Sequence, residues 1–159
     1  MEQRRPADPR LLWGFWALAA AGILLFAVLL RADLRGTRPL DAARYTEAAP
    51  AGFGYRCEAM PGEGVLTFRG WAAVEGEKLE TVDCRLVLYS PGEDRYYRLP
   101  TTMDPSEEAA AATGDPDAGF YAFALADQLP AGELELCFAY RSNGHNALIR
   151  TGQIVGGAL

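Results

Sequence analysis

An uninterrupted apolar run from Leu11 to Leu30 constrains this chain more than any other feature. About twenty residues of α-helix extend roughly 30 Å, which is the thickness of the hydrocarbon core of a bilayer. A helix also satisfies its own backbone hydrogen bonds where no water is present. Trp13 and Trp16 lie near one end of the run, and indole rings favour the headgroup region. The run therefore predicts a transmembrane helix over residues 11–30.

A cleaved signal peptide is the alternative interpretation, because the charged start MEQRR precedes the run. The apolar region of a signal peptide usually has about 7 to 15 residues and ends at a small-x-small cleavage motif. This run is longer and continues directly into LLRADLRGTR, which favours a retained, single-pass anchor. Arginines flank the run on both sides, so their distribution leaves both orientations open.

The pattern divides the chain into four parts. Residues 1–10 form a polar tail, residues 11–30 the span, residues 31–51 a linker without sustained periodicity, and residues 52–159 a single domain with one core. Acidic side chains outnumber basic ones in that domain, and the whole chain carries a net charge of −6. This balance disfavours nucleic acid and anionic lipid as partners of the domain.

Apolar residues recur at period two through the domain, which is typical of half-buried strands. In the segment 132–140, four apolar residues share one face that we expect to face the core: Leu134, Leu136, Phe138 and Tyr140. Further strands are expected at residues 65–74, 84–90, 95–101, 119–125 and 147–155. Turns rich in glycine, proline and asparagine separate them, as in hairpins. We therefore expect an all-β fold, an Ig-like antiparallel β-sandwich, after the transmembrane helix.

One segment, Met103 to Gly119, departs from this alternation. Asp104 to Glu108 supplies a cap-like residue and early acidic side chains, and Gly114 follows the alanines. A short helix and a mobile loop are both compatible with this pattern. Long loops in compact domains are often functional or disordered.

The sequence predicts no catalytic, cofactor or metal site, and we expect the protein not to be an enzyme. His145, the single histidine, lies in the turn SNGH, where a solvated side chain is the simpler interpretation than a general base. The cysteines lack CxxC spacing, and one histidine does not complete a familiar zinc set. Asp115 and Asp117 lie in an acidic cluster whose spacing matches no EF-hand.

The three cysteines raise the question of a disulfide. Cys84 is in phase with Leu86 and Leu88, whereas Cys137 has the parity of the polar face of its strand. A bridge from Cys84 to Cys137 across the core would therefore need a bulge or a bend. A Cys57–Cys137 bond, which joins the start of the domain to the outer face of a strand, fits the parity better. The odd number of cysteines leaves at least one thiol unpaired within the monomer.

Three tyrosines are candidates for a binding surface: Tyr96, Tyr97 and Tyr121. Alternation places Tyr96 and Tyr97 on opposite faces of their strand, and does the same for Phe120 and Tyr121. Some of these rings must therefore face solvent or an interface, where aromatic side chains stack on sugar rings or anchor protein partners. The alternative interpretation is cross-strand aromatic pairs that stabilise the sheet.

Short motifs, in a fixed order, point to a known kind of module. They are Gly70-Trp71-Ala72, Leu86-Val87-Leu88-Tyr89-Ser90, Tyr97-Arg98-Leu99-Pro100-Thr101, Ala118-Gly119-Phe120, Leu129-Pro130-Ala131-Gly132 and Ile149-Arg150-Thr151-Gly152. With them the chain, over about residues 65–155, resembles a small Ig-like or fibronectin-III-like β-sandwich module of Gram-positive bacteria. That module is attached to glycosyltransferases and other cell-surface polysaccharide proteins. The likeness breaks after YRLPT, where MDPSEEAAAA stands in place of an Arg and an Asp-Val pair.

The resemblance implies an accessory, non-catalytic role in the bacterial cell envelope, with a domain outside the cytoplasm and a glycan or envelope protein as partner. It implies no catalytic residue. An alternative is a small subunit of a membrane complex that contacts its partners through the helix. Gly14, Ala17 and Ala21 fall at helical spacing and would allow close packing of such a helix.

Overall fold

The computed structural model describes residues 9–155, which form parts of two compact units with a boundary between Arg35 and Gly36. The predicted polar tail lies outside the described residues except for Pro9 and Arg10. These two residues begin helix α1 (Pro9–Arg35). Proline suits the first turn of a helix, because the missing N–H has no intrahelical partner there.

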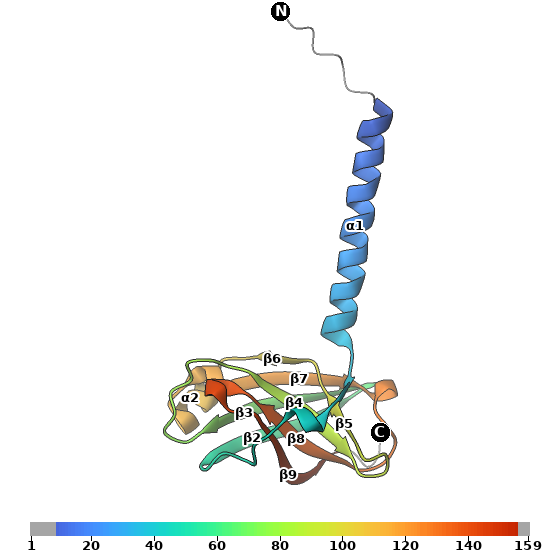
Figure 1. Ribbon diagram of the computed structural model, residues 1–159. Coiled ribbons are helices and arrows are strands. Elements are labelled where there is room, and N and C mark those ends of the chain that lie inside the picture. The colour runs from blue at the N-terminus through green and yellow to red at the C-terminus, as the bar shows by residue number, and fades with distance from the viewer. Residues whose placement is uncertain (1–8, 156–159) are drawn as a thin grey trace, which may run out of the picture. The chain divides into compact units, whose positions relative to one another are not determined.

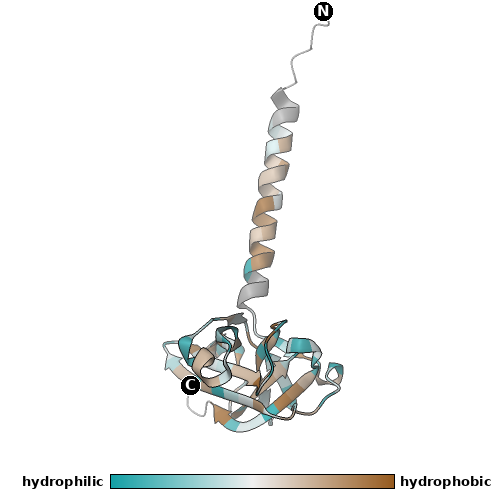
Figure 2. Ribbon diagram, turned by 90° about the vertical axis from the view of Figure 1, so that its left-hand side faces the viewer, coloured by the Kyte–Doolittle hydropathy of each residue, from teal (hydrophilic) through white to brown (hydrophobic). Residues whose placement is uncertain are grey.

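Helix α1 contains the whole predicted span and extends beyond it at both ends. Its segment from Trp13 to Arg31 is long and apolar enough to cross a membrane, a test that a signal sequence near the N-terminus also passes. Figure 2 shows the apolar colouring along this helix. Large side chains such as Trp13 and Leu18 are about three-quarters exposed.

The second unit is built on two antiparallel sheets (Figure 1). Sheet A has the strand order β1-β5-β4-β8-β9, and sheet B has the order β2-β3-β7-β6. The strands are β1 (Arg38–Leu40), β2 (Phe53–Gly62), β3 (Val65–Val74), β4 (Cys84–Ser90), β5 (Arg95–Arg98), β6 (Thr101–Met103), β7 (Gly119–Leu125), β8 (Leu134–Tyr140) and β9 (Ala147–Val155). One short helix, α2 (Glu107–Thr113), and four 3-10 turns connect them: η1 (Ala42–Arg44), η2 (Pro116–Ala118), η3 (Ala126–Gln128) and η4 (Ser142–Gly144).

Side chains from both sheets form the main core. Leu134, Leu136, Phe138 and Tyr140 are all buried in it, which confirms the face predicted from the alternation in β8. Strand β2 contributes aromatic rings from sheet B, with the Phe53 ring centroid 5.8 Å from that of Phe138. Such edge-to-face packing buries large apolar area in a favourable ring geometry.

The outer face of sheet A is covered by residues that were predicted to be a linker. Strand β1 pairs with β5, and Leu40 and Tyr45 pack on a second buried cluster that contains Val87, Cys137 and Ala139. The prediction of a tether over residues 31–51 is therefore wrong for residues 38–47. Strand β8 is consequently buried on both faces, whereas alternation alone had indicated one solvated face.

Helix α2 packs on the outer face of sheet B. The Ser106 hydroxyl caps the helix by accepting a hydrogen bond from the Ala109 N–H at 3.1 Å, and Gly114 ends it with a φ of 83°. Ala109 is fully buried against Ala73, with Trp71 beside it. Of the two interpretations open for residues 103–119, a short helix or a mobile loop, the structure shows the short helix.

Candidate functional site

A groove follows strands β2 and β3 on the outer face of sheet B. Alternate residues of β2, such as Phe53, Tyr55 and Cys57, face the core, so the residues between them face outward. Across the strand pair, Arg56 lies opposite Trp71 and Glu58 lies opposite Arg69. Two cavities lie along this face and make up what we call the β2–β3 groove. The larger, of about 420 Å³, is lined by Arg56, Glu58, Met60, Arg69, Gly70, Asp104, Ser106 and Glu108. The smaller, of about 200 Å³, is lined by Gly52, Gly54, Trp71, Ala73, Glu75, Gly76, Ala112 and Thr113.

Ion pairs compensate both arginines of the groove. Arg56 contacts Glu58 at 2.6 Å and Glu108 of α2 at 2.7 Å, and Arg69 contacts Asp104 at 2.9 Å. The Arg56–Glu58 hydrogen bond, followed by the charge of Glu108, raises the pKa of Arg56. Both arginine side chains are more than half exposed, so solvent screens these pairs and their contribution to stability is small. They leave charged hydrogen-bonding atoms at the surface of the groove.

The smaller cavity has an aromatic wall. A Cβ atom added to Gly54 would lie 3.5 Å from the six-membered ring of Trp71. Of the residues that the structure describes, none has an atom within 4 Å of the corresponding position on Gly76. The absence of a side chain at Gly54 keeps the space beside the half-buried Trp71 open, and Gly76 lines the same cavity.

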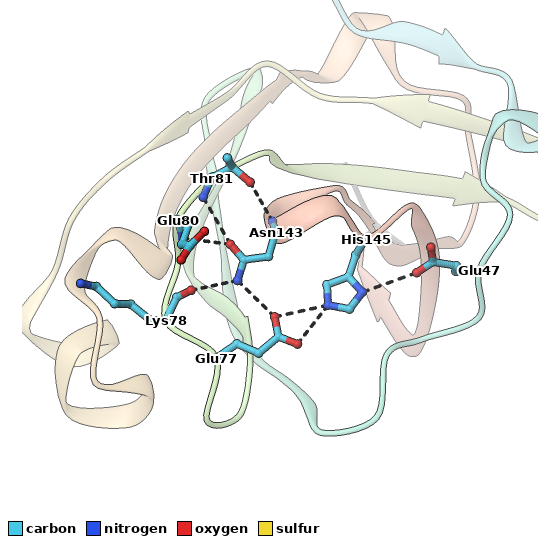
Figure 3. Close-up of polar contacts among 7 residues, drawn as sticks. All are labelled: Glu47, Glu77, Lys78, Glu80, Thr81, Asn143 and His145. Carbon is cyan, nitrogen blue, oxygen red and sulfur yellow. Dashed lines mark hydrogen bonds and ion pairs between the residues drawn. The ribbon is translucent and has the colours of Figure 1, made fainter.

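A second cluster of polar side chains joins three loops (Figure 3). His145 lies between two carboxylates, with Nε2 3.1 Å from Glu77 and Nδ1 3.5 Å from Glu47. The imidazole ring also lies against the ring of Tyr140, with centroids 5.8 Å apart. Glu47 belongs to the segment that covers sheet A, so His145 connects this segment to the loop that contains Glu77.

Asn143 holds the other half of this cluster together. Its side-chain amide donates to Glu77 at 3.1 Å and to the Lys78 carbonyl at 2.9 Å, and its oxygen accepts from the Glu80 N–H at 2.9 Å. The backbone of Asn143 has a φ of 53°, a left-handed conformation that asparagine tolerates better than most residues. The turn that contains His145 is therefore fixed by hydrogen bonds.

The two ionisable groups at the centre of the cluster stabilise each other's charged form. The hydrogen bond from Asn143, followed by that from His145, lowers the pKa of Glu77. The hydrogen bond to Glu77 raises the pKa of His145 against the opposing effect of desolvation, and Glu47 adds to the rise. His145 was predicted to lie in a solvated turn, and neither carboxylate partner was predicted, because both are distant from His145 in sequence.

The predicted Cys57–Cys137 disulfide is absent, and all three cysteines are free, buried thiols. Cys57 and Cys84 belong to the main core, whereas Cys137 lies on the outer face of sheet A beside Val87. The parity argument for Cys84 and Cys137 is confirmed. The prediction for Cys57 is wrong, because the parity of residues within one strand does not show on which side of sheet A strand β2 packs. Burial raises the pKa of each thiol to about 12.

The three tyrosines proposed as a binding surface do not share a face. Tyr96 packs on the outer face of sheet A, 4.6 Å from Tyr89 between ring centroids. Tyr97 lies on the other face of β5, and its hydroxyl donates to Glu93. Tyr121 is 38% exposed on the outer face of sheet B, opposite the groove residue Arg69. The structure therefore brings only Tyr121 close to the β2–β3 groove.

Among residues 9–155, no group of three or more histidine, cysteine, aspartate or glutamate side chains is arranged to hold a metal ion. In the acidic cluster singled out in the sequence, Asp115 accepts hydrogen bonds from the backbone N–H groups of Asp117 and Leu79. Its carboxylate therefore caps η2 and secures a neighbouring loop.

Comparison of the chain with protein-family models, curated proteins and solved structures finds no match.

Proposed function

We propose that the protein is a single-pass, membrane-anchored, non-catalytic binding or scaffolding domain of the bacterial cell envelope, accessory to the assembly of surface polysaccharide. In this proposal α1 is the anchor, and the two sheets form an Ig-like β-sandwich displayed outside the cytoplasm. Support comes from the apolar length of α1 and from the core that the two antiparallel sheets share. The sequence resemblance to envelope modules supplies the polysaccharide context.

The observation that carries the binding role is the β2–β3 groove. It presents charged and aromatic side chains along the surface of a folded unit, as ligand sites do. The one histidine supports the non-catalytic part. Among the described residues its contacts are two carboxylates and a tyrosine ring, which hold the imidazole between two loops.

The display of the domain outside the cell is tested with one introduced cysteine. Glu133 lies in the exposed turn before β8, so a Glu133→Cys chain carries a single accessible thiol. We expect a membrane-impermeant maleimide to label this variant in intact cells. The unmodified chain is the matched control and should stay unlabelled, because its thiols are buried and remain protonated. Labelling of Glu133→Cys only after non-denaturing lysis would place the domain in the cytoplasm and overturn the proposal.

A further inference from the structure

We propose that the β2–β3 groove is a binding site for an extended, uncharged oligosaccharide. The smaller cavity takes one sugar ring against Trp71, and the larger cavity hydrogen-bonds the hydroxyl groups of the neighbouring ring. The inference rests on the proposed binding role of this groove and adds the ligand class and the part that each cavity plays. It does not depend on the side of the membrane on which the domain lies.

The charges of the groove argue against an anionic ligand. Arg56 is shared between two carboxylates and Arg69 is paired with a third, so neither guanidinium offers an uncompensated positive charge. Glu75 adds a further carboxylate to the wall of the smaller cavity. Net positive charge favours the binding of phosphate groups and nucleic acids, and the side chains of this groove do not provide it.

The mixture of donors and acceptors suits hydroxyl groups. A hydroxyl donates one hydrogen bond and accepts others, so it is best bound where donors and acceptors alternate. Arg56 and Arg69 supply fixed forks of N–H donors, and Glu58, Asp104 and Glu108 supply carboxylate acceptors beside them. Hydrogen bonds to charged groups are the stronger kind, which compensates for the exposure of the site.

The smaller cavity suits the apolar face of a sugar ring. Trp71 provides flat aromatic surface, and Gly54 leaves space beside it that a larger residue would fill. Ala112 of α2 adds a small apolar group to the lining of this cavity. Stacking on an aromatic ring and hydrogen bonding of the rim are the two contacts that a sugar ring offers at once.

The two cavities lie end to end, which argues for a chain of sugars over a single one. Gly54 and Arg56 are successive outward-facing residues of β2, and Glu108 and Ala112 are one turn apart on α2. The outward residues from Gly54 to Met60 span roughly 20 Å at the rise of a strand. A peptide would instead pair with the backbone of β2, which is an edge strand of sheet B, and would not need this face.

The test uses Trp71 as the reporter in the full chain. The chain has three tryptophans, so Trp13→Phe with Trp16→Phe leaves Trp71 as the single one. The protein is placed in lipid nanodiscs, because sugar-based detergents would compete for the site. It is titrated with cellotetraose, maltotetraose and chitotetraose, and we expect at least one to change the Trp71 fluorescence in a saturable way.

Two substitutions test whether that signal comes from the groove. Gly54→Val fills the space beside Trp71, and Arg56→Gln removes hydrogen bonds to hydroxyl groups, so each should weaken binding at least about tenfold. Arg85→Gln is the matched control, since Arg85 is a similarly exposed arginine paired with Asp83 away from the groove. Circular dichroism confirms that each variant is folded.

The outcomes separate this inference from the proposed function. Saturable binding that is lost in Gly54→Val and Arg56→Gln but kept in Arg85→Gln supports the site. The inference is overturned by the absence of a saturable change with all three sugars, or by binding that both groove variants retain. Failure here with labelling of Glu133→Cys in intact cells rejects the groove as a sugar site and leaves the envelope location standing.

Discussion

Close backbone contacts explain why glycine occupies positions 70 and 119. A Cβ atom on Gly70 would lie 1.9 Å from the Arg56 carbonyl oxygen, and one on Gly119 would lie 2.2 Å from the Asp104 carbonyl oxygen. Neither glycine has a positive φ, so the requirement is for space and not for an unusual backbone conformation. Backbone atoms in paired strands cannot move aside as the end of a flexible side chain can. Both contacts therefore fix the strands that border the groove.

Gly70→Ala should destabilise the protein by roughly 2 to 4 kcal/mol, because β2 must move away from β3 to accommodate the methyl group. The measurement is urea unfolding of the full chain followed by circular dichroism. Gly92→Ala is the control, since Gly92 has open space around it and an ordinary φ, and its change should stay within about 0.5 kcal/mol. Equal midpoints for the two variants would show that the close contact does not constrain the sheet.

At the level of elements, the segment 38–47 is held by the loop between β8 and β9. The Thr46 and Glu47 N–H groups both donate to the Asn146 carbonyl at 3.1 Å, and the Asn146 side chain donates to the Arg44 carbonyl at 2.9 Å. His145 adds the ion pair with Glu47. These contacts close the segment over the buried outer face of sheet A.

This closure should depend on pH. The pKa of His145 is raised, chiefly by Glu77, so the stability from its charged form is fully present below the ordinary histidine pKa and is lost as pH rises through the raised value. The pKa of Glu77 is lowered, chiefly by Asn143, so its contribution is lost only as pH falls through the lowered value. The contacts are therefore strongest between the two values, in mildly acidic to neutral solution.

Hydrogen exchange at the Thr46 and Glu47 amides measures this effect. After correction for intrinsic rates, opening should become several-fold more frequent between about pH 6 and about pH 8. His145→Gln should remove most of that pH dependence, and Glu80→Gln, which changes a neighbouring exposed carboxylate, should preserve it. The same pH dependence in His145→Gln would contradict the role of the imidazole.

The elements that sequence analysis found and missed differ in a physical way. Strands β3, β4, β7, β8 and β9 carry their own alternation, which follows from having one face in the core. The alternation of Phe53, Tyr55, Cys57 and Ala59 was the available signal for β2. Strand β1 has only three residues, too few to show alternation, and it is ordered as a strand because it pairs with β5. Parity placed Tyr96 and Tyr97 on opposite faces of β5, but it does not show that β5 and β7, the strand of Tyr121, belong to different sheets. It could therefore not tell which of the three rings share a surface.

The whole molecule combines an apolar helix with a separately packed β unit. If α1 is retained as an anchor, the mature protein should stay in the membrane after an alkaline wash, and its intact mass should include residues 11–30. Leu24→Arg places a charge within the span at a cost of about 2.5 to 3.5 kcal/mol for insertion, so it should reduce the membrane-bound fraction. Leu24→Ile is the matched control and should not. A shorter, soluble product that lacks the apolar run would identify that run as a signal sequence.

The boundary between the units is also short. Only Gly36 and Thr37 separate the end of α1 from β1, and the Thr37 N–H donates to Gln128 at 3.2 Å. Tension on helix α1 would therefore act directly on β1, which is a three-residue edge strand. The β1–β5 pairs would bear that force before the central strands do. Release of residues 38–47 would lengthen the tether by roughly 30 Å while the main core stays closed. Under tension on the helix, residues 38–47 would therefore extend first, before the main core opens.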